Sequence, residues 1–345
     1  EENWDELIDS LLRANLFIQP VGEDHIYLRY HHLLRDFLES CMQRDYPEDA
    51  EHIQTRLANT WAERGEWERS YRIYRQIGHA EQLTDLVERA GPDLVARGRL
   101  TLLAEWLDKL SETARQRPTL ISLRATVLAV RGRSEESLAL FDSAIQSFEA
   151  SQDWINLARS LARRSTAHKL LGHYAQSLED IQRTLEIANR LEGPDAATLR
   201  ADALAGIGTA FFHQGNLASG LTWLNNALQA FEELGDSEAM AKTAMQIGMV
   251  ARALGRYPDA ERAYQRALDY YIDTGNLIWQ ANVLNNLGVL QHLRGNYEGA
   301  SGSFEKAIQY ARIGGYSGRG GHPTTNGGGL IRHLDPQREP PPGIK

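Results

Sequence analysis

Residues 248–267, GMVARALGRYPDAERAYQRA, decide the fold of this chain. A glycine, Gly255, stands in the middle, and the large Tyr264 follows nine residues later. Small residues precede this glycine by seven positions and follow it by five and twelve, at Gly248, Ala260 and Ala267. A small side chain on one helix that faces a large one on its neighbour lets the two helices interlock without voids. The stretch therefore predicts two helices joined by a tight turn at Gly255.

The same pattern recurs along the chain. Turn glycines stand at Gly65, Gly98, Gly132, Gly172, Gly215, Gly255 and Gly295, at intervals of 33, 34, 40, 43, 40 and 40 residues. Before the last five, the small residues are Ala125, Ser165, Gly208, Gly248 and Gly288, and after them the large ones are Phe141, Ile181, Leu224, Tyr264 and Phe304. This pattern resembles the tetratricopeptide repeat over about residues 118–313. The resemblance implies an all-α fold, a right-handed superhelix of antiparallel helix pairs. A HEAT or armadillo solenoid, which has a similar period without this ladder of small residues, is the alternative.

The spacing is about six residues wider than the usual tetratricopeptide period of about 34 residues. Residues 231–236 and 271–276 fill the difference. We therefore expect each helix pair to be longer than usual.

Composition excludes several classes of protein. Hydrophobic residues make up 42% of the 345, enough for a buried core, and the net charge of −9 disfavours nonspecific binding to nucleic acid or to anionic membranes. Cys41 is the only cysteine, so no disulfide can form within the chain. The sequence shows neither a signal peptide nor an apolar run of about 20 residues, which predicts a soluble cytoplasmic protein. It opens without Met and in a helical pattern, as expected of a piece of a longer protein.

The first residues follow a different pattern. Leu16-Phe17-Ile18 and Ile26-Tyr27-Leu28-Arg29-Tyr30 flank a mostly polar turn, which predicts a β-hairpin, and a helix is expected from His32. Together with Arg13-Ala14-Asn15 and residues 31–38, these stretches resemble the end of the winged-helix domain in MalT-like regulators. Those proteins are signal-transduction ATPases with numerous domains (STAND), often with a LuxR-type DNA-binding domain. Residues 97–107 also resemble the helical linker of that family.

We therefore expect four parts in the chain. They are the end of a winged-helix domain at 1–46, a helical linker at 47–117, the tetratricopeptide array at 118–313, and a Gly/Pro-rich disordered tail at 314–345. The tail holds Pro340-Pro341-Pro342 and many glycines, which disfavour helix.

The resemblance implies that His31 contacts the β-phosphate of bound ADP in the intact protein; a simple helix cap is the alternative. The chain has no Gly-x-x-x-x-Gly-Lys-[Ser/Thr] loop, so we expect ATP, ADP and Mg²⁺ to bind only with an upstream domain. It also has no His-Glu-x-x-His and no Gly-x-Ser-x-Gly motif. We expect no catalytic site in this chain, and ATPase activity only in the intact protein.

In tetratricopeptide proteins, ligands bind the concave groove lined by the first helix of each pair. This resemblance places the candidate binding residues at Arg159, Arg163, Lys169, Phe212, His213, Lys242, Gln246, Met249, Arg252, Asn285, Asn286 and His292. With Asp202 at an equivalent position, they include five basic residues and one acidic residue, a local charge of +4. Such groups suit an anionic or amide-rich ligand with an apolar part. Ordinary solvated helix positions are the alternative.

The resemblance implies a sensor region that binds an inducer, either a small molecule or a peptide or protein, and controls the nucleotide-binding module of its own chain. Self-assembly of the intact protein is also expected, and direct contact of this region with nucleic acid or membrane is not. The alternative function is a scaffold that binds a partner peptide in the same groove.

Overall fold

The computed structural model describes residues 10, 13, 18–21, 27–30 and 32–313. The chain divides into two compact units, Glu1–Arg97 and Gly98–Lys345. Apart from two short strands, the regular structure within the described residues is helical. His31 and the predicted tail at 314–345 lie outside the described residues.

The first unit begins with two strands. β1 (Ile18–Val21) pairs antiparallel with β2 (Tyr27–Tyr30), where the sequence predicts a β-hairpin; the connecting residues 22–26 lie outside the described part. Four helices follow, namely α2 (His32–Asp45), α3 (Pro47–Glu63), α4 (Trp67–Ile77) and α5 (Ala80–Ala96). α4 packs against both α3 and α5. The Tyr74 hydroxyl on α4 donates to the Asn59 amide oxygen on α3 at 2.6 Å, which ties these two helices together.

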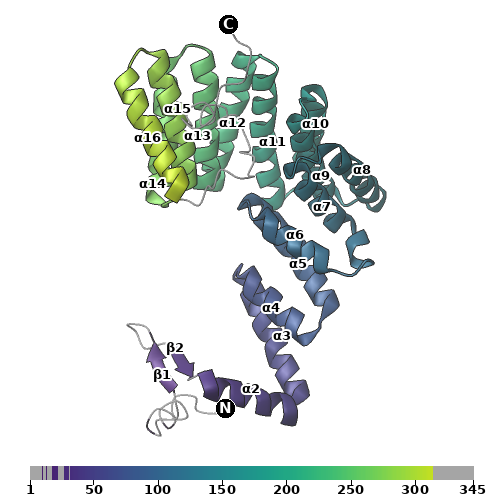
Figure 1. Ribbon diagram of the computed structural model, residues 1–345. Coiled ribbons are helices and arrows are strands. Elements are labelled where there is room, and N and C mark those ends of the chain that lie inside the picture. Colours follow the sequence, from purple (N-terminus) through teal and green to yellow (C-terminus); the bar gives the residue numbers. More distant parts are fainter. Residues whose placement is uncertain (1–9, 11–12, 14–17, 22–26, 31, 314–345) are drawn as a thin grey trace, which may run out of the picture. The chain divides into compact units, whose positions relative to one another are not determined.

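The second unit is a run of paired helices (Figure 1). It begins with α6 (Leu100–Lys109) and the short 3₁₀ helix η1 (Ala114–Gln116). The pairs are α7 (Pro118–Val130) with α8 (Ser134–Ser151), α9 (Trp154–Leu170) with α10 (Tyr174–Asn189), α11 (Pro194–His213) with α12 (Leu217–Leu234), α13 (Ser237–Ala253) with α14 (Tyr257–Asp273), and α15 (Leu277–Leu293) with α16 (Tyr297–Ile313). Each second helix also packs against the next first helix, as expected of stacked repeats.

The turns lie where the glycine spacing predicts them. Gly255 has φ +73°, a left-handed conformation that costs glycine nothing, and the next amide, of Arg256, donates to the Ala251 carbonyl at 2.9 Å. The other turn glycines of the array have φ between +77° and +82°. The predicted register of helices and turns is therefore confirmed.

The pairing of small and large residues is also confirmed. A Cβ atom added at Gly248 would lie 2.5 Å from Cε1 of Tyr264, which is fully buried. Added at Gly208, it would lie 2.7 Å from Cγ of Leu224, and at Gly288 it would lie 2.7 Å from Cε1 of Phe304. Each glycine therefore lets the ring or branch of the facing helix lie directly on its backbone.

The extra residues of the wide repeat lengthen its second helices. α12 continues to Leu234 and ends at Gly235, which has φ +70°. The Asp236 carboxylate then accepts the Ala239 amide at 2.9 Å and caps α13. Asn276 caps α15 in the same way after Gly275. The predicted lengthening of the helix pairs is confirmed. The glycine followed by Asp or Asn marks a second set of turns that the glycine spacing alone did not reveal.

Candidate functional site

All twelve predicted binding residues lie on first helices. They are carried by α9, α11, α13 and α15, and consecutive first helices of the array contact one another. We call the side formed by these residues the first-helix face. Some of these side chains are buried or form ion pairs within the protein, and others have no acidic partner among the described residues.

Two of the five cations on the first-helix face have acidic partners. Arg159 forms an ion pair with Asp195 on α11 at 3.0 Å. Lys242 pairs with Glu238, one turn earlier on α13, at 2.6 Å, and its ammonium lies 5.9 Å from the centre of the Trp279 ring. These two charges are balanced within the described part of the protein.

The Arg252 side chain on α13 lies beside Tyr264 on α14. Its Nε atom is buried, and its guanidinium acts on the pKa of Tyr264, lowering it against the larger rise that burial causes. The sequence predicts Arg252 as a ligand-binding cation. The structure places it beside a core tyrosine instead, so part of its hydrogen-bonding capacity faces the protein interior.

Arg163 is different because its contact in the fold is a neutral one. Its Nη1 donates to the Ser122 hydroxyl on α7 at 3.3 Å, and the Ser160 hydroxyl donates to the same oxygen at 2.9 Å. The side chain is half-buried, and burial, followed by repulsion from Arg159, lowers the pKa of Arg163 to about 10. A solvent-accessible guanidinium surrounded this closely by protein is typical of the wall of a concave surface.

Lys169 and His213 are neighbours across α9 and α11. Burial lowers the pKa of Lys169, and burial followed by the Lys169 charge lowers the pKa of His213. The His213 ring stacks on Tyr174, with ring centres 5.0 Å apart and planes 1° apart, and Phe212 meets it edge-on at 5.4 Å. The described residues give Lys169 no acidic partner within 4 Å.

The remaining predicted residues differ in exposure. Gln246 and Met249 are half-buried, and Met249 packs against the core cluster around Tyr264. Asn285 and Asn286 are 3% and 9% exposed, so both amides are buried within α15 packing and do not line an open surface. His292 is exposed and contacts Tyr297 edge-on, with ring centres 5.2 Å apart.

Asp202 on α11 is an acid among these groups. One side of its side chain is open to solvent, yet the protein around it, with a contribution from Asp236, raises its pKa to about 6, while Lys242 opposes the rise. A carboxyl group in this environment changes charge close to neutral pH. A charge placed next to it on the first-helix face would therefore change the protonation of Asp202.

Asp202→Asn tests this environment. Because the pKa of Asp202 is raised from 3.8 to about 6, the folded protein binds more protons than the unfolded chain between pH 4 and 6, and this group destabilises the fold as pH rises through that window. We expect Asp202→Asn to raise the free energy of unfolding at pH 7.5 and not at pH 4. The gain should stay below about 1 kcal/mol, because solvent screens an exposed carboxylate. Urea unfolding at both pH values measures it, and a gain at pH 4 alone would contradict the assignment.

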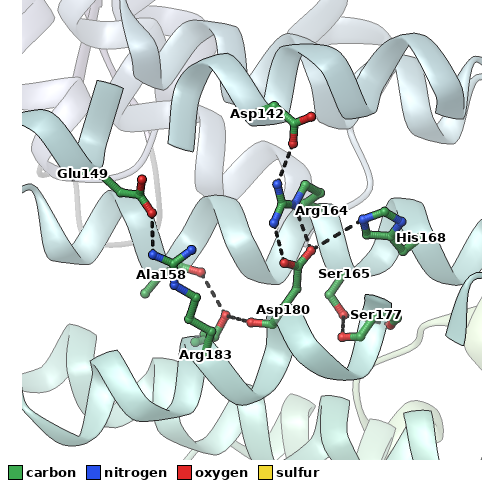
Figure 2. A network of polar contacts seen from close by, with 10 residues as sticks. Asp142, Glu149, Ala158, Arg164, Ser165, His168, Ser177, Asp180 and Arg183 are labelled. Carbon is green, nitrogen blue, oxygen red and sulfur yellow. Dashed lines mark hydrogen bonds and ion pairs between the residues drawn. The ribbon is translucent and has the colours of Figure 1, made fainter. Parts of the chain in front are cut away.

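The sequence did not reveal a second polar cluster, in which α9 contacts α8 and α10 (Figure 2). Arg164 donates to both carboxylate oxygens of Asp180 on α10, at 2.9 and 2.6 Å, and to Asp142 on α8 at 2.5 Å. The His168 ring lies 3.8 Å from Asp180. Hydrogen bonding to Asp180 raises the pKa of Arg164. Two adjacent arginines thus have different roles, because Arg164 joins α9 to α8 and α10 while Arg163 contacts Ser122 on α7.

Other features of the described residues do not form a competing site. A small hollow lined by Leu107, Asp108, Arg115, Leu120 and Arg124 contains none of the predicted residues. Within the part of the chain that the structure covers, no group of His, Cys, Asp and Glu side chains is arranged to hold a metal ion. Among the same residues, no helix has the length and apolar character to cross a membrane.

Two segments of the chain match models of known protein families. Residues 1–50 match the MalT winged helix domain, and residues 199–273 and 239–313 match the tetratricopeptide repeat. The chain therefore resembles MalT at its start and carries tetratricopeptide repeats over residues 199–313. This chain is 25% identical over 201 residues to the HTH-type transcriptional regulator MalT of Vibrio cholerae, and 24% identical over 183 residues to that of Vibrio parahaemolyticus. These matches cover 58% and 53% of this chain but 22% and 20% of the relatives, so the chain spans about a fifth of their length.

Two solved structures share the fold of this chain. A STAND protein with a tetratricopeptide repeat sensor from Pyrococcus horikoshii superposes with a TM-score of 0.65 at 18% identity, over 91% of this chain and 47% of that one. A Rap protein in complex with Competence and Sporulation Factor superposes with a TM-score of 0.57 at 15% identity, over 76% and 77% of the two chains. At these identities the likeness establishes the fold alone. The expected order of winged helix and tetratricopeptide repeats is confirmed.

Proposed function

We propose that this chain is the ligand-sensing region of a MalT-like signalling ATPase and transcription regulator. Its first-helix face receives an inducer, and the bound form controls the nucleotide-binding module upstream. The observation that carries this proposal is the pair of half-buried cations on α9, Arg163 and Lys169, for which the described residues provide no acidic partner. Charged groups with perturbed pKa values and unused binding capacity gather at functional sites.

The mechanism we propose is a shift between two populations of the intact protein. In one, this region contacts the nucleotide-binding module and His31 contacts bound ADP. In the other, those contacts are released, ADP exchanges, and the protein self-assembles. An inducer that binds the second form more tightly shifts the protein toward it, by no more than its difference in affinity for the two forms. ATP or ADP with Mg²⁺ would be held by the upstream module.

A scaffold that binds a partner peptide on the same face is the second candidate. It is supported by the fold shared with the Rap protein, which was solved in complex with Competence and Sporulation Factor. Half-buried Met249 and Phe212 next to the polar groups would suit a peptide with apolar side chains. The two candidates differ in whether binding changes nucleotide exchange.

A thermal-shift screen of the chain against metabolites and peptides, followed by nucleotide exchange in the intact protein, separates the two candidates. A ligand at about 100 times its Kd should stabilise the chain by about 2.7 kcal/mol. ATP and ADP serve as negative controls, because the chain has no phosphate-binding loop. The sensor proposal expects a ligand that also accelerates ADP release. A ligand that binds and leaves ADP release unchanged would contradict that proposal and favour the scaffold.

A further inference from the structure

Side chains of three helices meet near the α14–α15 turn, at the end of the array where α13 also begins (Figure 1). The Glu238 carboxylate on α13 binds the Lys242 ammonium at 2.6 Å, and this ammonium lies 5.9 Å from the centre of the Trp279 ring on α15. The Trp279 ring stacks on Tyr271 of α14, with ring centres 5.5 Å apart and planes 11° apart. The Gln280 amide donates to the Tyr271 carbonyl at 2.7 Å, which fixes the start of α15 against the end of α14. Measured contacts therefore connect these side chains from helix to helix.

This arrangement already holds a positive charge. The Lys242 ammonium is bound by a carboxylate and lies over an indole ring, and both kinds of partner attract ammonium and guanidinium groups. Glu238 is exposed, while Lys242 and Trp279 are half-buried, so dissolved molecules can reach all three. A cation from solution can therefore compete with Lys242 for the same partners.

The Tyr271 hydroxyl is an unused group beside these partners. Tyr271 is 1% exposed, and its hydroxyl oxygen has no hydrogen-bond partner among the described residues. Burial, followed by the charge of Glu238, raises the pKa of Tyr271, so the hydroxyl lies close enough to this carboxylate to interact with it. A buried hydroxyl without a partner destabilises the protein, and a ligand that supplies a partner removes that cost. Lys242 does not supply one, although it binds the same carboxylate.

Acidic groups outnumber basic ones in this part of the first-helix face. Asp236, which caps α13, and Lys242 both lie close enough to Asp202 on α11 for their charges to act on its carboxyl group. Together with Glu238, three carboxylates thus share one ammonium. A Lys242 side chain that leaves Glu238 has other carboxylates within reach, which lowers the cost of displacing it. The charge of +4 counted from the sequence therefore does not describe this end of the face.

We propose that Glu238 and Trp279, with the Tyr271 hydroxyl beside them, form a subsite for a guanidinium group of the ligand, and that Lys242 occupies this subsite in the unliganded protein. This inference rests on the proposed function and names a chemical group of the inducer. A guanidinium is planar and carries five donors, so it can bind the carboxylate with two hydrogen bonds, stack on the indole ring and still donate to a third acceptor. The ammonium of Lys242 is a point charge and lacks this geometry.

The test uses methylguanidinium and methylammonium chloride as probes on the whole chain, with ionic strength held constant by sodium chloride. The readout is the NMR signal of the Trp279 indole N–H, assigned by its loss in Trp279→Phe. Methylguanidinium should shift this signal with a Kd of roughly 1–10 mM, as expected of so small a ligand, and should bind at least about threefold more tightly than methylammonium. N-acetylarginine amide as the stronger ligand would indicate an arginine of a peptide, and equal binding a free guanidino compound.

The decisive variant is Glu238→Gln with Asp202→Asn, which keeps the shape of two exposed side chains and removes their charges. It should weaken methylguanidinium binding by about tenfold. The matched control is Asp259→Asn with Glu261→Gln, which removes two carboxylates at the opposite end of α14 and should keep the affinity within about twofold. Lys242→Met should instead tighten binding by about fivefold or more, because the competing ammonium is gone. An ion pair with a purely structural role predicts no such gain.

Four outcomes would overturn the inference. They are no shift of the Trp279 signal by methylguanidinium, tighter binding of methylammonium than of methylguanidinium, an equal loss in the decisive variant and the control, and unchanged or weaker binding in Lys242→Met. The proposed function is tested separately, because an inducer without a guanidinium group that accelerates ADP release would sink the subsite and leave the sensor intact. Guanidinium binding at Trp279 that leaves ADP release in the intact protein unchanged would do the reverse.

Discussion

Gly248→Leu should disrupt the pairing of α13 with α14 and lower the free energy of unfolding by about 3 kcal/mol or more. The backbone of Gly248 lies against the Tyr264 ring, where even a Cβ atom would come within 2.5 Å of Cε1. Tyr264 is fully buried in the core cluster that joins α13, α14 and α15, so its ring has no free space to enter. Urea unfolding followed by circular dichroism measures the loss.

Two control variants make this result specific. Gly302→Ala on α16 adds a methyl group where no atom lies within 4 Å, so it should stabilise the chain by about 0.5–1 kcal/mol through helix propensity alone. Tyr264→Val should recover part of the Gly248→Leu loss in a double-mutant cycle, because the two side chains compete for the same volume. Equal effects of Gly248→Leu and Gly302→Ala would show that the helix register is wrong.

Asp180→Ala is the second substitution for which we expect a large effect. Asp180 is 5% exposed and accepts two hydrogen bonds from Arg164 (Figure 2), which its removal would leave facing a partly buried space. Breaking a buried ion pair by removing one partner typically costs about 3–5 kcal/mol. Because Arg164 keeps its contact with Asp142, we expect a loss near the lower end of this range, measured as the change in free energy of unfolding.

Asp142→Ala provides the matched control. Its carboxylate binds the same guanidinium, but its side chain is 63% exposed, so the loss should not exceed about 1 kcal/mol. Replacing both buried partners, Arg164→Met with Asp180→Leu, should recover most of the stability lost in Asp180→Ala, since no uncompensated charge remains. Similar losses for Asp142→Ala and Asp180→Ala would show that burial of the Arg164–Asp180 pair does not determine its contribution to stability.

The repeat could be predicted from the sequence because its signals are local. A glycine at a turn and small residues at fixed distances from it determine which helices pair and in which register. The contact between Gly248 and Tyr264 confirms both for α13 and α14. The helix that carries a residue follows from its distance to the turn glycine, which is why all twelve predicted binding residues lie on first helices.

The sequence could not predict what each side chain on that face contacts. Arg163 and Arg164 are adjacent and chemically identical, yet one faces α7 and the other binds carboxylates on α8 and α10. Burial of Asn285 and Asn286, and the approach of Arg252 to Tyr264, depend on side-chain rotamers and on residues many positions away. Such contacts are set by packing between helices, which spacing along one helix does not encode.

The two turns that end α12 and α14 have nearly the same construction, and this affects how the array can change in length. Both combine a left-handed glycine, Gly235 or Gly275, with a following side chain that caps the next helix. Deletion or duplication of the gene segment that encodes residues 237–276 would therefore leave the helices connected by a turn of the same kind. No new loop conformation would be needed. Since each repeat mainly contacts its neighbours, the rest of the array would keep its packing. The first-helix face can thus lengthen or shorten in whole steps of one helix pair.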